Sequence, residues 1–219
     1  MVGIVLLLQM TCALIVPFVL MDPIVRGYPA FLETAAASSG RIRVGVGVAF
    51  IGAALTVYLS VRILPVIRKY SLTVAVWFLA ICIVSAALDA VHNASVISML
   101  SVSERFTTSG GGDPHYQAWG AAAGSMRRSA HVVQLVAIGT WMMSFYISLW
   151  RFKLVPRILS TLGIVGVISQ FTGVTAMMFL GLPSITYLAM PLAPIHAATG
   201  IWLIAKGFSM DSDSTTPYL

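Results

Sequence analysis

The chain has 219 residues, of which 58% are hydrophobic and only 9% are charged, and its formal net charge at pH 7 is +6. Soluble domains carry about 25% charged residues, so this composition excludes a soluble enzyme and predicts an integral membrane protein with almost no extramembrane part. The basic residues lie near the ends of apolar segments and are not interleaved with aromatic residues, so we expect contact with membrane lipids and no nucleic-acid partner.

The apolar segments predict an all-α, polytopic membrane helix bundle of about six transmembrane helices, since about 20 apolar residues cross a bilayer. In chain order, the predicted helices are Val2–Leu20, Val44–Ile67, Leu72–Leu100, Arg127–Trp150 (with a start as early as Pro114 left open), Arg157–Leu182 and Ser184–Lys206. They make one transmembrane bundle over residues 1–208. The polar tail at 209–219 is predicted to be disordered.

Two long loops connect the predicted helices. Met21–Arg43 contains a predicted short interfacial helix at Tyr28–Ala37, which carries Glu33, and Ser101–Met126 contains a glycine-rich run that predicts flexibility. Basic residues are spread almost evenly over the two sides of the bundle, so the sequence leaves the membrane orientation open. It leaves the oligomeric state open as well.

A polar face interrupts the third predicted helix. Asp89 lies three residues before His92 and four before Asn93, so the three side chains share one face of that helix. Burying an Asp in hydrocarbon costs roughly 2.5–3.5 kcal/mol by insertion scales. Because chains rarely carry this cost without a use, the face is our first candidate for a functional site.

A matching face lies on the fourth predicted helix, where Arg127, His131 and Gln134 are four and three residues apart. Helices that follow each other in sequence are usually neighbours in space, so we expect the two polar faces to meet near one membrane surface. The simplest arrangement is a single cavity that also contains Gln170 and His196. The candidates for its apolar walls are Trp77, Phe78, Trp141, Phe145, Phe171, Phe179, Tyr187 and Trp202.

These polar residues also have structural interpretations. Asp89 would pair with Arg127 or His131 and hold the two helices together, and His92 would be only a partner of Asp89. His196 lies in a proline-kinked helix, where it would cap a freed backbone carbonyl. The sequence leaves the structural and the chemical interpretations open.

Metal or haem binding is a separate alternative. His92, His131 and His196, with Asp89 near them, offer imidazole and carboxylate ligands on three helices. No local signature such as H-x-x-x-H or H-E-x-x-H accompanies them. We therefore expect neither a metal nor another cofactor, and keep a metal- or haem-binding protein as an alternative.

Three segments carry a resemblance to a known family: Leu64–Lys69 (LPVIRK), Lys153–Gly163 (KLVPRILSTLG) and Gly200–Phe208 (GIWLIAKGF). Through them the chain from Met10 to Phe208 resembles a bacterial family of six-helix membrane proteins known only as a domain of unknown function. The resemblance implies a multi-pass protein of the bacterial cytoplasmic membrane. It implies no activity, since the family is uncharacterised.

The chain departs from the pattern of that family in two places. The family commonly has an acidic residue six positions before the Trp of its last motif, where this chain has His196. The combination of Asp89, His92 and Asn93 is not usual in its third helix. Such a redistribution of polar residues fits a specialised site, and neutral drift would also produce it.

The expected function is that of a membrane enzyme acting on a lipophilic substrate, as a proton-initiated cyclase of isoprenoids, similar in general design to integral-membrane terpene cyclases. A carboxylic acid that burial keeps protonated can protonate an epoxide or an alkene. Asp89 is the first candidate for this acid and Glu33 the second, with His92 or His131 orienting it or accepting the final proton.

The remaining candidates would bind the substrate. Aromatic faces stabilise carbocations, each by roughly 0.5–2 kcal/mol. The predicted substrate-binding residues are Asn93, Arg127, Gln134, Gln170, His196, Trp77, Trp141, Phe145 and Trp202. A small transporter is a further alternative, and the lack of an internal repeat counts against it.

Overall fold

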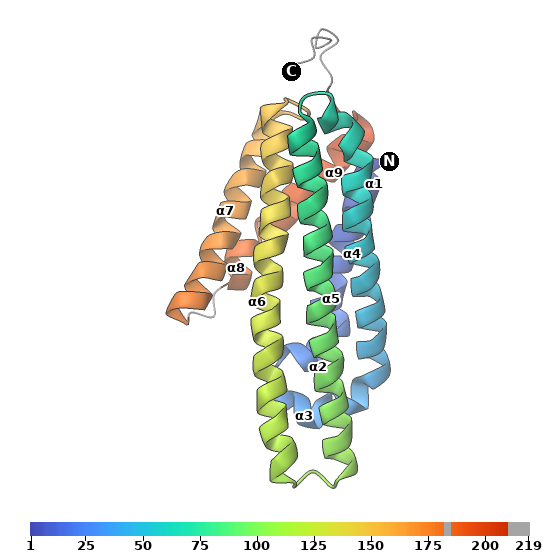
Figure 1. Ribbon diagram of the computed structural model, residues 1–219, viewed down its shortest axis with the longest axis vertical. Coiled ribbons are helices and arrows are strands. Elements are labelled where there is room, and N and C mark those ends of the chain that lie inside the picture. The colour runs from blue at the N-terminus through green and yellow to red at the C-terminus, as the bar shows by residue number, and fades with distance from the viewer. Residues whose placement is uncertain (182–184, 210–219) are drawn as a thin grey trace. The chain divides into compact units, whose positions relative to one another are not determined.

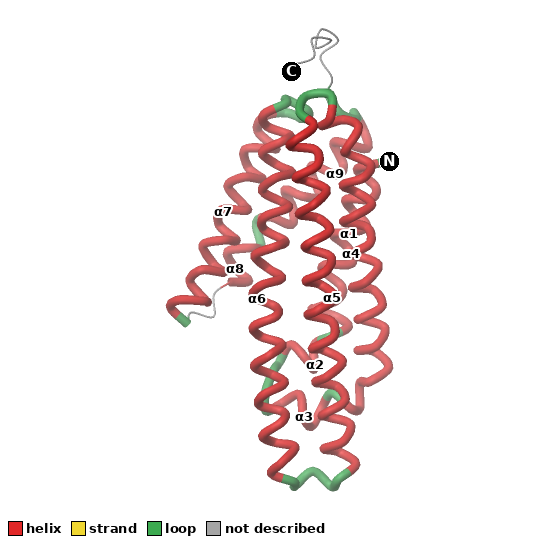
Figure 2. Tube along the Cα trace, viewed as in Figure 1, coloured by secondary structure: helices red, strands yellow, loops and turns green. Residues whose placement is uncertain are grey.

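The computed structural model describes residues 1–181 and 185–209, and in these ranges the chain consists of helices and short connections without a strand (Figure 2). Six helical segments are long and apolar enough to cross a membrane: Val2–Leu20, Ala36–Arg68, Leu72–Thr108, Pro114–Arg151, Arg157–Leu180 and Tyr187–Ala205. The predicted fold class, an all-α polytopic membrane protein, is therefore confirmed.

The described chain forms a series of helices that are joined by short connections. In chain order, the helical elements are α1 (Val2–Ile15), the π-helical segment η1 (Val16–Leu20), α2 (Asp22–Val25), α3 (Ala30–Thr34), the 3-10 segment η2 (Ala36–Ser38), α4 (Ser39–Arg68), α5 (Leu72–Thr108), α6 (Pro114–Arg151), α7 (Arg157–Leu180), α8 (Ile185–Ala189) and α9 (Leu192–Ala205). Helix α7 ends at Gly181, whose φ of 67° is the left-handed conformation that glycine adopts without strain. The predicted limits Leu182 and Ser184, and residues 210–219 of the predicted disordered tail, lie outside the described residues.

Contacts divide the chain into two compact units, each assembled from parts of several helices. The first unit contains Met1–Met10, Ala54–Ala86 and Leu135–Leu219, and the second contains Thr11–Ala53 and Ala87–Gln134. Each unit has an apolar core of its own.

Helices of the first unit approach each other closely at glycine. Gly163 of α7 lies against the ring of Tyr146 of α6, and a Cβ at this position would overlap the ring. Gly139 of α6 faces the ring of Phe171 of α7 in the same way. Small residues at such contacts are typical of membrane helices, where van der Waals packing drives association.

In the second unit, α5 and α6 run side by side and are joined by a short connection (Figure 1). The prediction of a loop over Ser101–Met126 is therefore wrong except at 109–113, and the earlier start of the following helix at Pro114 is confirmed. The physical reason is tertiary: Phe106 is buried in the core of this unit, while the Thr107 hydroxyl donates to a carbonyl one turn earlier. The polar residues that suggested a loop therefore lie on the last turns of α5 and the first turns of α6.

The predicted interfacial helix is also shorter than expected. Phe31 and Leu32 of α3 are buried in the core of the second unit, so they do not anchor the chain at a membrane surface. Ser103 of α5 donates to the carbonyl of Leu32 (2.9 Å) and accepts from the N–H of Ala36 (3.0 Å). In a continuous α-helix these two backbone groups bond to each other, so the inserted hydroxyl separates α3 from η2.

Candidate functional site

The polar faces predicted on α5 and α6 meet in the second unit. Gln134 Nε2 donates a hydrogen bond of 2.6 Å to Asp89 Oδ1, and His131 Nδ1 lies 2.9 Å from Gln134 Oε1. Because an amide oxygen only accepts, His131 donates through Nδ1, and Nε2 of the neutral ring is left as an acceptor. The result is a directed chain of hydrogen bonds from His131 through Gln134 to Asp89.

This chain corrects the pairing expected for Asp89. Among the described residues Asp89 forms no ion pair with Arg127, and Gln134 stands between it and His131. The expected antiparallel contact between the two helices is present, since residues 45 positions apart bond directly. The amide leaves Oδ2 of Asp89 outside the chain, where a carboxyl proton would sit.

His92 and Asn93 complete the cluster from α5. Their side chains are only 7% and 2% exposed, and the His92 ring centroid lies 5.1 Å from that of His131, with the ring planes inclined by 38°. In the described part of the chain, His92 Nε2 and both polar side-chain atoms of Asn93 have no hydrogen-bond partner. A buried polar group without a partner costs about 1–3 kcal/mol, so these atoms mark a place where a polar ligand group would be stabilised.

Two of the remaining predicted polar residues, His196 and Gln170, belong to the first unit. His196 is 2% exposed, and its Nδ1 lies 2.9 Å from the Tyr146 hydroxyl, so it bonds a side chain and does not cap a carbonyl there. Trp141 and Phe145 pack edge-on against its ring at centroid distances of 6.0 and 6.2 Å. Gln170 Nε2 donates to the carbonyl of Leu135 at 3.4 Å, a long bond between α7 and α6.

The other candidates are more scattered. Trp77 is 57% exposed and donates through Nε1 to Ser144 at 3.3 Å, while Trp202 Nε1 is buried and has no partner among the described residues. Glu33 is exposed on α3. The structure brings four of the predicted residues into direct contact, namely Asp89, Gln134, His131 and His92, and places Asn93 and Arg127 on the same two helices within the second unit.

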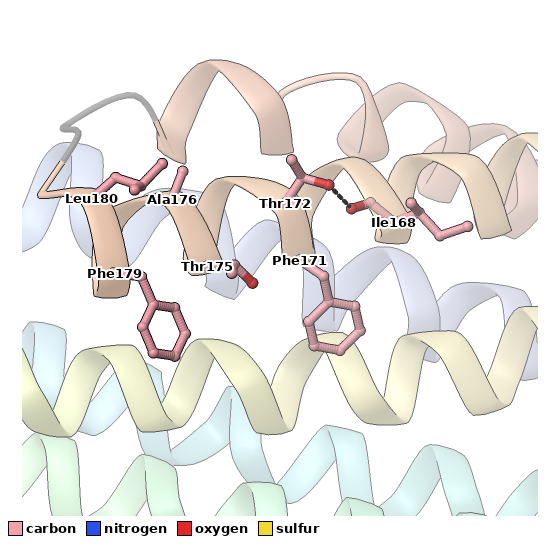
Figure 3. A pocket seen from close by; sticks show the side chains of 7 residues that line it. All are labelled: Ile168, Phe171, Thr172, Thr175, Ala176, Phe179 and Leu180. Atoms are coloured by element: carbon pink, nitrogen blue, oxygen red, sulfur yellow. Dashed lines mark hydrogen bonds between the residues drawn. The ribbon is translucent and has the colours of Figure 1, made fainter.

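Two open grooves lie elsewhere. The first runs along α7, where Phe171 and Phe179 project from the same side of the helix with Thr175 between them (Figure 3). The second lies between α5 and α6 and is lined by Val91, Ala94, Ser95, Ser98, Ala122, Ser125, Met126, Ser129 and Ala130. The first contains two of the predicted aromatic wall residues, and neither contains the polar cluster. The single cavity that would join acid and aromatic walls stays a prediction.

Sequence reasoning missed two residues that shape these sites. Tyr146 holds His196, and Ser103 breaks the helix between α3 and η2. Nothing in the local pattern indicates either role, because both partners are distant in sequence. The groove between α5 and α6 could have been found from the sequence. Ala94 and Ser98, which line it, are small residues four positions apart on α5, and this spacing is typical of faces where membrane helices approach each other.

The comparisons with known proteins give one match. The profile of a family described as "Domain of unknown function (DUF4386)" matches residues 1–207. No curated protein and no solved structure matches the chain. The match covers nearly all of the described chain and supplies no activity.

Proposed function

Since the chain belongs to the DUF4386 family, as its sequence motifs predicted, and that description names no activity, we propose a function from the site alone. The protein is an integral-membrane enzyme that performs acid–base chemistry on the polar end of a lipophilic substrate. One observation carries this proposal: the hydrogen-bond chain that holds Asp89 through Gln134, beside the partnerless Nε2 of His92.

Each residue has a separate role in this chemistry. Asp89 is the acid, because Gln134 occupies Oδ1 and leaves Oδ2 to transfer a proton to the substrate. His131 positions Gln134 and does not touch the substrate. His92 Nε2 accepts the proton that the product releases. Return of this proton from His92 to Asp89 restores the starting state, so the substrate is isomerised without net loss of a proton.

Isoprenoids are the substrate class that best suits an acid acting alone. Protonation of one alkene or epoxide gives a carbocation, the π electrons of a second alkene in the same substrate form the new ring bond to it, and loss of a proton gives a product of unchanged mass. A bilayer supplies such substrates and excludes the water that would capture the cation. The cyclisation of a prenylated lipid is therefore the reaction to test first.

The decisive variant is Asp89→Asn. Asn keeps an oxygen that accepts from Gln134 but carries no acidic proton, so a merely structural Asp89 predicts normal turnover and a catalytic one predicts a loss of about 10²- to 10⁴-fold. The purified protein is incubated with epoxidised and plain prenylated lipids, and isomeric products are separated by chromatography with mass detection.

The matched control is Asp113→Asn. Asp113 accepts from the backbone N–H of His115 at the start of α6, a capping role that Asn fills equally well, so turnover is expected to be unchanged. Full turnover by Asp89→Asn on a substrate that the wild type converts would overturn the proposal.

A metal- or haem-binding protein is the alternative to this proposal. Residues 1–181 and 185–209 contain no group of three or more His, Cys, Asp or Glu arranged to hold a metal ion. A visible spectrum and metal analysis of the purified protein test it directly. A Soret band, or stoichiometric metal, that disappears in His131→Ala would replace the acid–base proposal.

A further inference from the structure

Arg127 adds an unbalanced positive charge to the polar cluster. It lies one turn before His131 on the face of α6 that carries Gln134, and its side chain is half-buried. In the described part of the chain, it forms neither an ion pair nor a side-chain hydrogen bond. A guanidinium has five N–H donors and is always charged, so a half-buried one without acceptors is costly.

The groups around Arg127 do not neutralise it. His92 and His131 pack against each other, with ring centroids 5.1 Å apart, and neither brings a negative charge. The one carboxyl group of the cluster, Asp89, accepts from Gln134 and carries a proton in the proposed mechanism, so it adds no negative charge. Arg128, its neighbour in sequence, is exposed and adds a second positive charge. An anion is the missing partner.

The same face of α6 is covered up to one turn before Arg127. A Cβ at Gly120 would lie 2.8 Å from the side chain of Leu32, and one at Gly124 would lie 3.5 Å from that of Tyr28. The α2–α3 region therefore packs against this face as far as Gly124, one turn before Arg127.

We propose that Arg127 and Asn93 bind the phosphate of an anionic lipid head group. This deepens the proposed function and rests on it, because it makes the polar end of the substrate a phosphate. The forked donors of Arg127 match phosphate oxygens, and the Asn93 amide, 2% exposed and without a partner among the described residues, supplies a further donor. His92 Nε2 stays available for the proton that the reaction releases.

The test measures binding without turnover. The full-length protein is purified in a maltoside detergent, which contains no phosphate, and titrated by calorimetry with dodecyl phosphate, with dodecanol and with inorganic phosphate. Wild type is expected to bind dodecyl phosphate, and Arg127→Gln to bind it about 10- to 100-fold more weakly. The matched control is Arg128→Gln, which removes the neighbouring exposed charge and is expected to retain the affinity.

Three results would overturn the proposal: equal affinity for dodecanol and dodecyl phosphate, equal affinity of Arg127→Gln and wild type, or equal losses in Arg127→Gln and Arg128→Gln. If inorganic phosphate binds as tightly as dodecyl phosphate, the anion site stands and the lipid source is refuted. If Arg127→Gln fails to fold, Asn93→Ser and Arg127→Lys are measured, and wild-type affinity in both would overturn the proposal.

Asp89→Asn separates this inference from the proposed function. The variant is expected to bind dodecyl phosphate like wild type and to lack turnover. Binding that depends on Arg127, together with full turnover by Asp89→Asn, would refute the acid and leave the phosphate site standing. Turnover that depends on Asp89, without any phosphate binding, would refute only the site proposed for Arg127 and Asn93.

Discussion

Replacing Gln134 with Leu tests whether the hydrogen-bond chain joins α5 to α6. The variant keeps a side chain of similar length but removes the bond of 2.6 Å to Asp89 and the bond of 2.9 Å to His131. Because Asp89 carries a proton in the proposed mechanism, both bonds join neutral groups, and each contributes about 0.5–1.5 kcal/mol. All three side chains are half-buried and water replaces part of these bonds, so we expect a loss of about 1–2 kcal/mol.

For a chain of this length, that loss corresponds to a fall in Tm of about 2–8 °C. Thermal unfolding in detergent, followed by circular dichroism, measures it, and Gln117→Leu on the exposed side of α6 is the control with the same chemical change. An equal Tm for the two variants would refute the reasoning, because it would mean that the bonds from Gln134 stabilise the folded protein no more than solvent does.

Two further variants test the packing of each unit. Ser103→Ala removes the hydroxyl that bonds the carbonyl of Leu32 and the N–H of Ala36. We expect the free energy of unfolding, measured by chemical denaturation, to fall by about 1–3 kcal/mol, because these two backbone groups lose their partner. An unchanged free energy of unfolding would show that the two groups bond each other without strain. Gly163→Ala places a methyl group against the ring of Tyr146, so we expect the free energy of unfolding to fall by about 1–3 kcal/mol. Gly47→Ala is the control, because the space around Gly47 is open and no loss of stability is expected. Equal Tm values for the two variants would contradict the close contact at Gly163.

The sequence determined which helices cross the membrane and which faces carry polar groups. Apolar length alone is enough for the first, since lipid offers no partner to backbone N–H and C=O groups and only helices of sufficient length satisfy them. Helical periodicity is enough for the second, because Asp89 and His92 share a face whatever surrounds it. The resemblance to a membrane family of unknown function, found in the sequence, agrees with the family that the chain belongs to.

Tertiary structure decided the pairing within those faces. The helical spacing admitted Arg127 or His131 as the partner of Asp89, and the register of α5 against α6 selected Gln134. The same contacts decided where α5 ends: its polar last turns have the composition of a loop, but burial of Phe106 against the α3 region keeps them helical. Periodicity fixes the direction of a side chain on its own helix, whereas its partner depends on how far a second helix is shifted and rotated, which local sequence does not encode.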